Sequence, residues 1–234
     1  MKKIFYFICL VTALSITSCS NNDELVVKPT KTGTMTDKEG NQYNWVCIGK
    51  LDWMAENLKC GTPYYDQTYL DKWGDEFYSF EISNYAESRK QFKLFGNYYT
   101  YDEAVANAPE GWRLPTDEDW KALEMALGMS EGSANELGWR GGAGSLLIQT
   151  IDQGTGINLR FGGELCHFGY GFAWEVNEYH IYDYGMYWSS TLDTATTEKA
   201  AFFRKVTPSQ NAVERNSALV AYRYCSVRYV RDAQ

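Results

Sequence analysis

The chain has 234 residues, and its 30 acidic residues outnumber its 22 lysines and arginines, which gives a formal net charge of −8 at pH 7. An acidic surface repels phosphate backbones and anionic headgroups, and no basic stripe offsets it, so nucleic acid is not an expected partner. Aromatic residues make up 16% of the chain and glycine occurs 20 times, a composition that favours a strand-rich, turn-rich fold over a helical bundle.

The first 18 residues have the pattern of a signal peptide. Lys2 and Lys3 precede an apolar run over residues 4–14, and small residues lead to Cys19. The run is shorter than the roughly 20 apolar residues of a membrane-spanning helix. A cysteine at this place resembles the lipobox of bacterial lipoproteins, which implies that residues 1–18 are removed and that Cys19 carries the lipid. A secreted protein in which Cys19 is incidental is the less favoured alternative.

Residues 19–32 are polar and acidic and show no apolar periodicity, so they are predicted to form a flexible tether. The lipid on Cys19 would make the membrane a partner and place the protein in the cell envelope. Ser20 argues against retention at the inner membrane, and the acidic pair Asp23 and Glu24 resembles signals that send some lipoproteins to the cell exterior. The outer membrane is therefore the favoured location.

Short strands and a turn begin the folded part. Residues 34–36 and 42–48 flank a hairpin turn at 37–41, in which Gly40 suits a positive φ. The turn superficially resembles a calcium loop, but it lacks the ligand spacing and the distal Glu of such loops. A third strand is expected at 51–57.

The clearest helix signal covers residues 117–127. Thr116 is a good N-cap, acidic residues fill the first turn, and Asp119 can close a capping box. Weaker helical signals lie at 83–91 and 101–106.

Strand-like segments dominate the second half of the chain. They cover residues 157–161, 164–174, 186–192, 200–206, 212–216 and 222–230. Two early strands, helices in the first half and a late antiparallel meander predict one α+β domain with long loops over residues 33–232.

Four cysteines follow Cys19. They are Cys47, Cys60, Cys166 and Cys225, an even number that permits two disulfides with three connectivities in an oxidising compartment. The favoured pairs are Cys47 with Cys60 and Cys166 with Cys225, because the first two lie close in sequence.

Residues 168–188 are dense in aromatic side chains separated by glycines. Such rings can stack against sugar faces, and nearby carboxylates can accept hydrogen bonds from hydroxyl groups. The candidate ligand-binding residues are Tyr170, Trp174, Glu178, Tyr179, Tyr182 and Asp183. Strand alternation alone would turn about half of the rings inward, so a core and scaffold role is favoured over a ligand surface.

The two histidines, His167 and His180, fall in the same region without the spacing of a zinc site. They are better explained as structural residues, and no metal or cofactor is expected. No catalytic residue is assigned, because Ser189 and Ser190 lack a Gly-x-Ser-x-Gly turn.

Four sequence segments stand out in a fixed order. They are 37–59 with Trp-Met-Ala-Glu-Asn-Leu at 53–58, Phe-Gly-Asn-Tyr-Tyr-Thr-Tyr at 95–101, the stretch 111–123 that opens with Gly-Trp-Arg-Leu-Pro-Thr, and Tyr-Trp-Ser-Ser-Thr at 187–191 with the terminal 226–232. Together they resemble the Fibrobacter succinogenes major paralogous domain. The Gly-Trp-Arg-Leu-Pro-Thr run is shared with the sulfatase-modifying-factor family.

Both families resemble the C-type-lectin-like fold. This implies that the two ends of the chain pair as neighbouring strands and that a loop-rich half presents ligands. Calcium binding is suggested only by analogy with lectins, and their Glu-Pro-Asn and Trp-Asn-Asp signatures are absent from this sequence. The chain departs from the family where Tyr229 replaces a usual cysteine, which puts the pairing of Cys225 in doubt, and residues 61–93 match poorly.

These features favour a non-enzymatic envelope module that binds a glycan or a protein through a loop face centred on residues 168–186, with 61–93 as a second contributor. One alternative is an enzyme that uses Cys166 and Cys225, because the sulfatase-modifying relatives use a pair of cysteines. Another is a structural subunit of an envelope or fimbrial assembly.

Three arginines recur in the resembling motifs. Arg113, Arg228 and Arg231 each lie beside apolar residues. They are predicted to form structural ion pairs with acids such as Glu56 or Asp119 rather than to bind anionic ligands.

Overall fold

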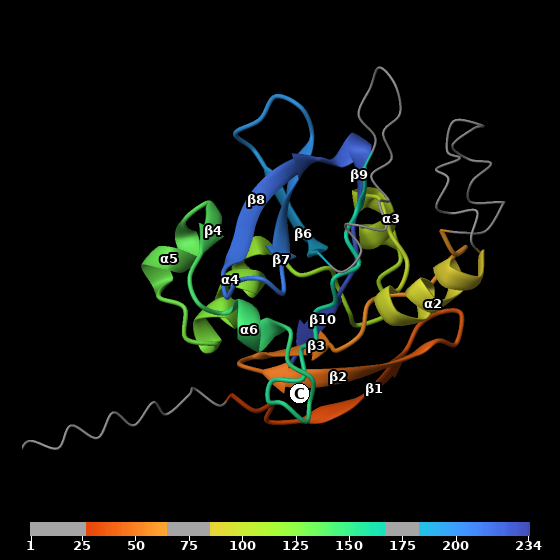
Figure 1. Ribbon diagram of the computed structural model, residues 1–234, viewed down its shortest axis with the longest axis horizontal. Coiled ribbons are helices and arrows are strands. Elements are labelled where there is room, and N and C mark those ends of the chain that lie inside the picture. Colours follow the sequence, from red (N-terminus) through yellow and green to blue (C-terminus); the bar gives the residue numbers. More distant parts are fainter. Residues whose placement is uncertain (1–26, 65–84, 167–182) are drawn as a thin grey trace, which may run out of the picture.

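Two four-stranded antiparallel sheets frame the part of the protein that the computed structural model describes, residues 27–64, 85–166 and 183–234 (Figure 1). The first sheet contains, in order, β1 (Thr32–Thr36), β2 (Gln42–Ile48), β3 (Leu51–Met54) and β10 (Val230–Asp232). The second contains, in order, β4 (Gly138–Arg140), β8 (Val213–Leu219), β7 (Ala200–Val206) and β6 (Gly185–Asp193). A further pair joins β5 (Leu165–Cys166) to β9 (Arg223–Tyr224).

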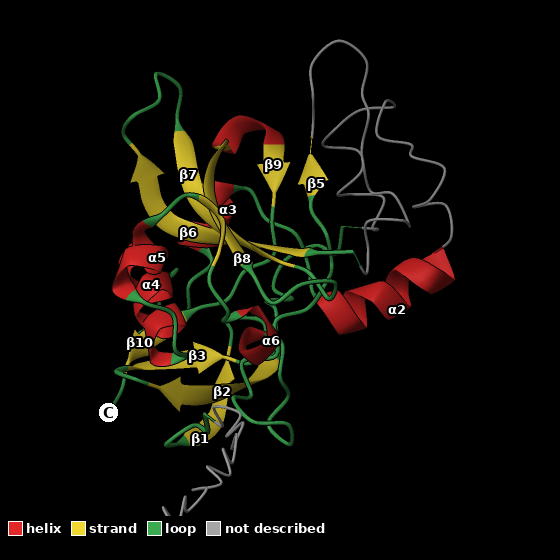
Figure 2. Ribbon diagram, turned by 60° about the vertical axis from the view of Figure 1, so that its left-hand side comes forward, coloured by secondary structure: helices red, strands yellow, loops and turns green. Residues whose placement is uncertain are grey.

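Short helices surround the sheets. They are α2 (Tyr85–Phe95), α3 (Tyr101–Ala106), α4 (Asp117–Ala126), α5 (Glu131–Asn135), α6 (Gly144–Leu147) and the 3-10 turn η2 (Val220–Tyr222). Figures 1 and 2 show α2 on the opposite side of the molecule from α4 and α5. In the described parts of the chain, no helix is long and apolar enough to cross a membrane. The predicted α+β class is confirmed.

The two ends of the folded chain meet in the first sheet. Strand β10 pairs antiparallel with β3, and Val230 lies opposite Trp53. The Arg113 N–H also donates to the Val230 carbonyl, at 2.9 Å, so the chain end is held on both sides. Both ends therefore lie in one sheet, but the expected pairing as neighbours is wrong, because β10 pairs with β3 and β1 stands at the opposite edge.

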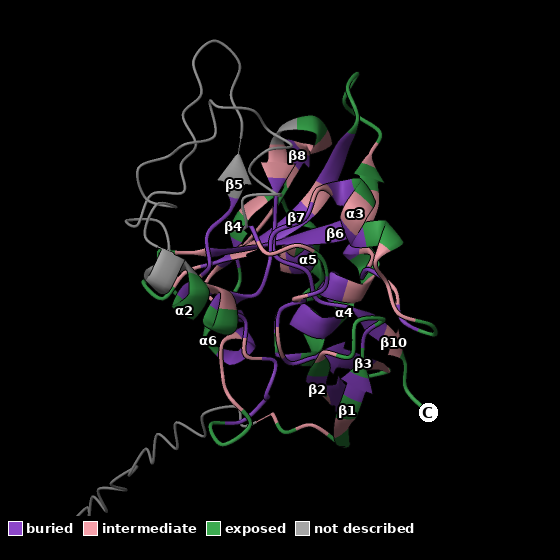
Figure 3. Ribbon diagram, turned by 90° about the vertical axis from the view of Figure 1, so that its right-hand side faces the viewer, coloured by how far each residue is buried: buried purple, intermediate pink, exposed green. Residues whose placement is uncertain are grey.

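Alternate residues of the same strands enter two separate buried clusters. Met54 belongs to one cluster and its neighbour Trp53 to the other, and the same division separates Trp188 from Tyr187. Because neighbouring strand residues point to opposite faces, both faces of these strands are covered. Figure 3 shows this burial along the strands, whereas α2 keeps an exposed face.

Helix α4 forms where its capping sequence predicts it. The Thr116 hydroxyl accepts the Asp119 N–H, and the Asp119 carboxylate accepts the Thr116 N–H at 2.7 Å, which closes the capping box. The turn at 37–41 is confirmed as well, because the Asp37 carboxylate accepts the N–H groups of Glu39 and Asn41 and the Tyr43 hydroxyl.

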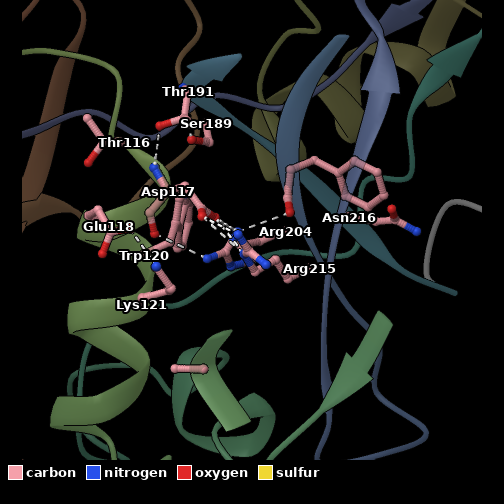
Figure 4. Close-up of polar contacts among 12 residues, drawn as sticks. Thr116, Asp117, Glu118, Trp120, Lys121, Ser189, Thr191, Arg204, Arg215 and Asn216 are labelled. Atoms are coloured by element: carbon pink, nitrogen blue, oxygen red, sulfur yellow. Dashed lines mark hydrogen bonds and ion pairs between the residues drawn. The ribbon is translucent and has the colours of Figure 1, made fainter. Parts of the chain in front are cut away.

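A network of buried charges fixes α4 to the second sheet (Figure 4). Arg204 of β7 bonds Asp117 at 2.7 Å and Glu124 at 2.6 Å. Arg140 of β4 forms two 2.9 Å hydrogen bonds with Glu124, and Arg215 of β8 lies 2.7 Å from Asp117. Each of the three guanidinium groups therefore meets at least one carboxylate.

Two predicted strands are wrong. Residues 157–161 form no strand, because Asn158 takes a φ of 55°, which an extended chain does not adopt. Residues 222–230 divide into the end of η2, β9 and the start of β10. In the segment 157–161, Ile157 and Leu159 enter the same buried cluster without strand pairing.

Candidate ligand-binding groove

A groove of about 740 Å³ opens between four segments of the chain. Its floor is the β1–β2 hairpin, and its walls are residues 55–59, the end of α2 and residues 150–160. A second pocket of about 430 Å³ adjoins it and shares Leu94 and Arg160 with it. Volumes of this size are typical of small-molecule sites.

The floor depends on one strand pair. Thr34 lies opposite Asn44 and Thr32 lies opposite Val46, so these four side chains share one face of the hairpin. Gly33 is needed on this pair, because a Cβ there would lie 2.4 Å from the Trp45 ring.

Glu56 is a carboxylate held firmly at the groove. Its Oε1 accepts the Asn44 backbone N–H at 3.1 Å and the Asn44 amide at 3.0 Å. The Lys59 Nζ lies 3.6 Å from its other oxygen. Glu56 and Asn44 thus form a preorganised pair of hydrogen-bonding groups.

The facing wall contains a strained residue. Asn158 has a φ of 55°, and its Oδ1 is buried without a hydrogen-bond partner among the described residues. Residues held in such conformations with unsatisfied polar atoms gather at functional sites. Behind Asn158, Gly156 packs so closely on the floor that a Cβ would lie 2.9 Å from Val46.

Arg228 lies behind the wall and is only 1% exposed. Its guanidinium donates to Asn57 Oδ1 at 2.6 Å, to the carbonyls of Met54 and Ile157 at 2.8 Å each, and to the Asn158 carbonyl at 2.6 Å. None of these acceptors is charged. Burial lowers the pKa of Arg228 to about 10.

Comparison with known proteins identifies the family. Residues 46–231 match the family model described as Fibrobacter succinogenes major domain. The chain belongs to this family. No curated protein and no solved structure matches it.

The aromatic candidates of this Fibrobacter succinogenes major domain cannot be compared with the groove. Tyr170, Trp174, Glu178, Tyr179 and Tyr182 lie outside the described residues, as do Cys19 and both histidines. Asp183 is described, and it is exposed in the turn before β6. Of the predicted second contributor, 61–93, Lys93 lines the groove, and the contribution of this stretch to a face centred on 168–186 stays a prediction.

The predicted disulfide between Cys47 and Cys60 is wrong, because both cysteines are free and buried. Cys47 lies opposite Asp52 near the β2–β3 turn, whereas the Lys59 N–H beside Cys60 donates to the Tyr43 hydroxyl at the start of β2. A strand rises about 3.3 Å per residue, so the length of β2 separates the two thiols. A disulfide needs Cα atoms about 4.4–6.8 Å apart.

The other favoured pair, Cys166 with Cys225, stays a prediction. Strand register places Cys166 opposite Arg223, and the Cys166 side chain lies outside the described side chains. Cys225 is completely buried in the domain.

The three motif arginines of the domain behave differently from one another. Arg113 pairs with Asp119 through two hydrogen bonds, as predicted. Arg231 pairs with Asp52 at 2.8 Å, which confirms a structural role with a different acid. The ion pair predicted for Arg228 is wrong, because its guanidinium donates to an amide and three carbonyls, and no described carboxylate lies within ion-pair distance.

The groove residues escaped the sequence interpretation because they come from four segments. Asn158 and Arg160 lay in a predicted strand, and Lys93 in the stretch that matched the family poorly. Two signals were present: the motif at 53–58, which contains Glu56, and Gly-Thr-Gly at residues 154–156, which marks an irregular turn.

Proposed function

We propose that this protein is a non-enzymatic binding module of the cell envelope, anchored through lipid on Cys19, that holds a glycan in the groove. The signal-peptide pattern and the cysteine that follows it support the anchor, and Ser20 with the acidic pair Asp23 and Glu24 favours the outer membrane. The single observation that carries the binding function is the groove, in which fixed polar groups stand beside exposed apolar side chains.

The lining matches the mixed character of a sugar. Asn44 and Glu56 offer a donor and an acceptor in fixed positions. Leu94 and Ile151 are 53% and 52% exposed, and both line the groove, where they can cover the apolar face of a sugar ring.

Thiol chemistry is the less favoured alternative. Burial raises the pKa of the Cys60 thiol to about 11, and nearby Glu39 acts in the same direction. A thiol with a raised pKa is a poor nucleophile near neutral pH, because little thiolate is present. Cys225 is 0% exposed, which gives a substrate no access to it.

A glycan array tests the binding function. The chain is expressed from its full sequence, purified in detergent and compared with Leu94→Ala, Ile151→Ala and a matched control, Leu137→Ala. Leu137 is 62% exposed and does not line the groove. We expect binding that both groove variants weaken and the control does not.

Three other outcomes would count against this proposal. Binding that is lost in Trp174→Ala or Tyr182→Ala but not in the groove variants would move the site to the aromatic segment. No binding across the array would overturn a glycan ligand and favour a protein partner. Recovery of a Cys19→Ser chain in the membrane fraction at the wild-type level would overturn the lipid anchor.

A further inference from the structure

Positive charge gathers in the groove of an otherwise acidic protein. Lys59, Lys93 and Arg160 line it, and Glu56 is the one carboxylate among the described residues that do so. The chain as a whole has a formal charge of −8. Charges of one sign in a concave site focus the electric field there, so this groove attracts anions even though the net charge of the protein repels them.

Arg228 adds a fourth positive charge just behind the surface. Two of the residues that hold it, Asn57 and Asn158, themselves line the groove. An ion taken out of water into a protein costs several kcal/mol unless a counter-charge offsets it. The hydrogen bonds to neutral acceptors and the nearby charge of Glu56 offset part of this cost, and an anion in the groove would offset more.

Arg160 is positioned to meet that anion. The Arg160 N–H donates to the Tyr187 hydroxyl at 2.6 Å, and this hydroxyl donates to the Arg160 carbonyl at 2.7 Å, so the backbone is fixed. Its guanidinium has no hydrogen bond or ion pair within the described parts of the chain, and it lines both pockets. A free planar guanidinium on a rigid backbone suits a carboxylate, which it can bind through two parallel hydrogen bonds.

The carboxylate of the groove has a different chemistry, and it lines the first pocket alone. Glu56 accepts hydrogen bonds from Asn44 and lies beside Lys59, so part of the local charge there is already compensated. A carboxylate only accepts hydrogen bonds, and it therefore suits a ligand that presents hydroxyl groups. The groove thus offers unpaired cations at Arg160 and Lys93 and a hydroxyl-binding group at Glu56.

We infer that the groove binds an acidic saccharide, with a uronic-acid carboxylate at Arg160 and Lys93 and sugar hydroxyls at Glu56 and Asn44. This inference rests on the proposed function and adds the charge and orientation of the ligand. An acidic peptide fits less well, because its carboxylates would meet Glu56 without hydroxyl groups to satisfy it.

Calorimetric titration of the full chain in detergent tests the inference. The probes are oligosaccharides of galacturonate, glucuronate and mannuronate, each matched by the neutral oligosaccharide of the same sugar. We expect the best uronate to bind about tenfold or more tightly than its neutral match, a difference of about 1.4 kcal/mol. Arg160→Gln and Lys93→Gln should each weaken uronate binding about tenfold, and Lys50→Gln, outside the groove, should not.

The remaining outcomes separate this inference from the proposed function. Equal binding of neutral and acidic oligosaccharides would overturn the acidic ligand and leave a glycan-binding module standing. Silence with every probe would overturn the acidic saccharide, and the array decides whether any glycan binds. Polyglutamate bound in place of uronates, with the same loss in Arg160→Gln, would replace the saccharide with an acidic protein. Uronate binding unchanged in Arg160→Gln would remove that residue from the site.

Discussion

Beneath α4, each of three buried arginines touches a carboxylate, whereas Arg228 behind the groove has an amide, backbone carbonyls and the Tyr187 ring as its neighbours. Both regions are inside the same domain and both remove guanidinium groups from water. They differ in whether the protein itself supplies the opposite charge. In the first region the domain itself supplies the opposite charges. In the second region an anion bound in the groove can supply the opposite charge.

The α4 network fixes the position of the helix more than it adds to the net stability of the domain. Buried ion pairs often contribute little compared with apolar residues of the same size, because desolvation offsets their attraction. Arg204 nevertheless bonds Asp117 at the start of α4 and Glu124 two turns later, so it fixes the helix against β7 in one register. In the groove only Lys59 lies beside a carboxylate, that of Glu56, so Arg160 and Lys93 have no ion-pair partner among the described residues.

Glu124→Gln should give the largest effect. The change leaves Arg140 and Arg204 without their shared carboxylate in a site that is 0% exposed. Breaking a buried pair in this way costs about 3–5 kcal/mol in the free energy of unfolding. Denaturant unfolding measures it, and Glu118→Gln on the exposed side of α4 is the matched control. A loss below about 1 kcal/mol would show that the network does not depend on its charges.

The second-largest effect should be a loss of stability in acid, which arises in the same region. Burial raises the pKa of Asp117, but hydrogen bonds from Arg215 and Arg204 outweigh it and hold the pKa below its ordinary value of 3.8. The folded carboxylate therefore binds protons less readily than the unfolded one. Its contribution to stability is complete above the ordinary pKa and is lost as the pH falls through the folded pKa.

Unfolding free energies measured from pH 7 downward test this dependence. Asp117→Asn should be less stable at pH 7 and should lose less stability in acid than the wild type does. Arg160→Gln removes no carboxylate, so it should keep the wild-type slope. Equal acid slopes in Asp117→Asn and the wild type would assign acid unfolding to other carboxylates.

The charge network beneath α4 also shows which features can be predicted from sequence. Thr116 and Asp119 are three residues apart, and their capping box depends only on local geometry, so the start of α4 was predictable. The Arg113–Asp119 pair is local as well. The partners Arg204 and Glu124 are 80 residues apart, and only the folded sheet brings them together.

The groove was not predictable for a related reason. Ile157 and Leu159 alternate with polar residues as a strand would, but both are buried from an irregular segment, because the positive φ of Asn158 breaks the extended chain. Alternation reports burial on one side, and it does not distinguish a strand from a coil that packs against the core. Arg160 follows this segment, so its place in a groove depends on a backbone conformation that periodicity does not encode.

Arg113→Gln should have an intermediate effect. Its side chain is 43% exposed and that of Asp119 is 14% exposed, so the pair stands between the buried network and the open groove. A half-exposed pair of this kind contributes about 1 kcal/mol or less. Thermal unfolding checks the value, and Thr116→Ala gives a comparison, since loss of an N-cap costs about 1 kcal/mol. A loss as large as that of Glu124→Gln would contradict the ranking by burial.

Arg160→Gln should change stability least, by no more than about 0.5 kcal/mol. Its guanidinium has no hydrogen bond or ion pair among the described residues, so its removal breaks no polar interaction that the structure shows. Burial lowers the pKa of Arg228, and the charge of Arg160 lowers it further. Removing that charge relieves a repulsion, so the small change should be toward greater stability and should shrink as salt is added. Denaturant unfolding at low and high ionic strength measures this change in stability. Lys50→Gln, which also removes one positive charge, is the matched control. A loss above about 1.5 kcal/mol would make Arg160 a structural residue, and the groove would then lose the free cation on which its preference for an anion depends.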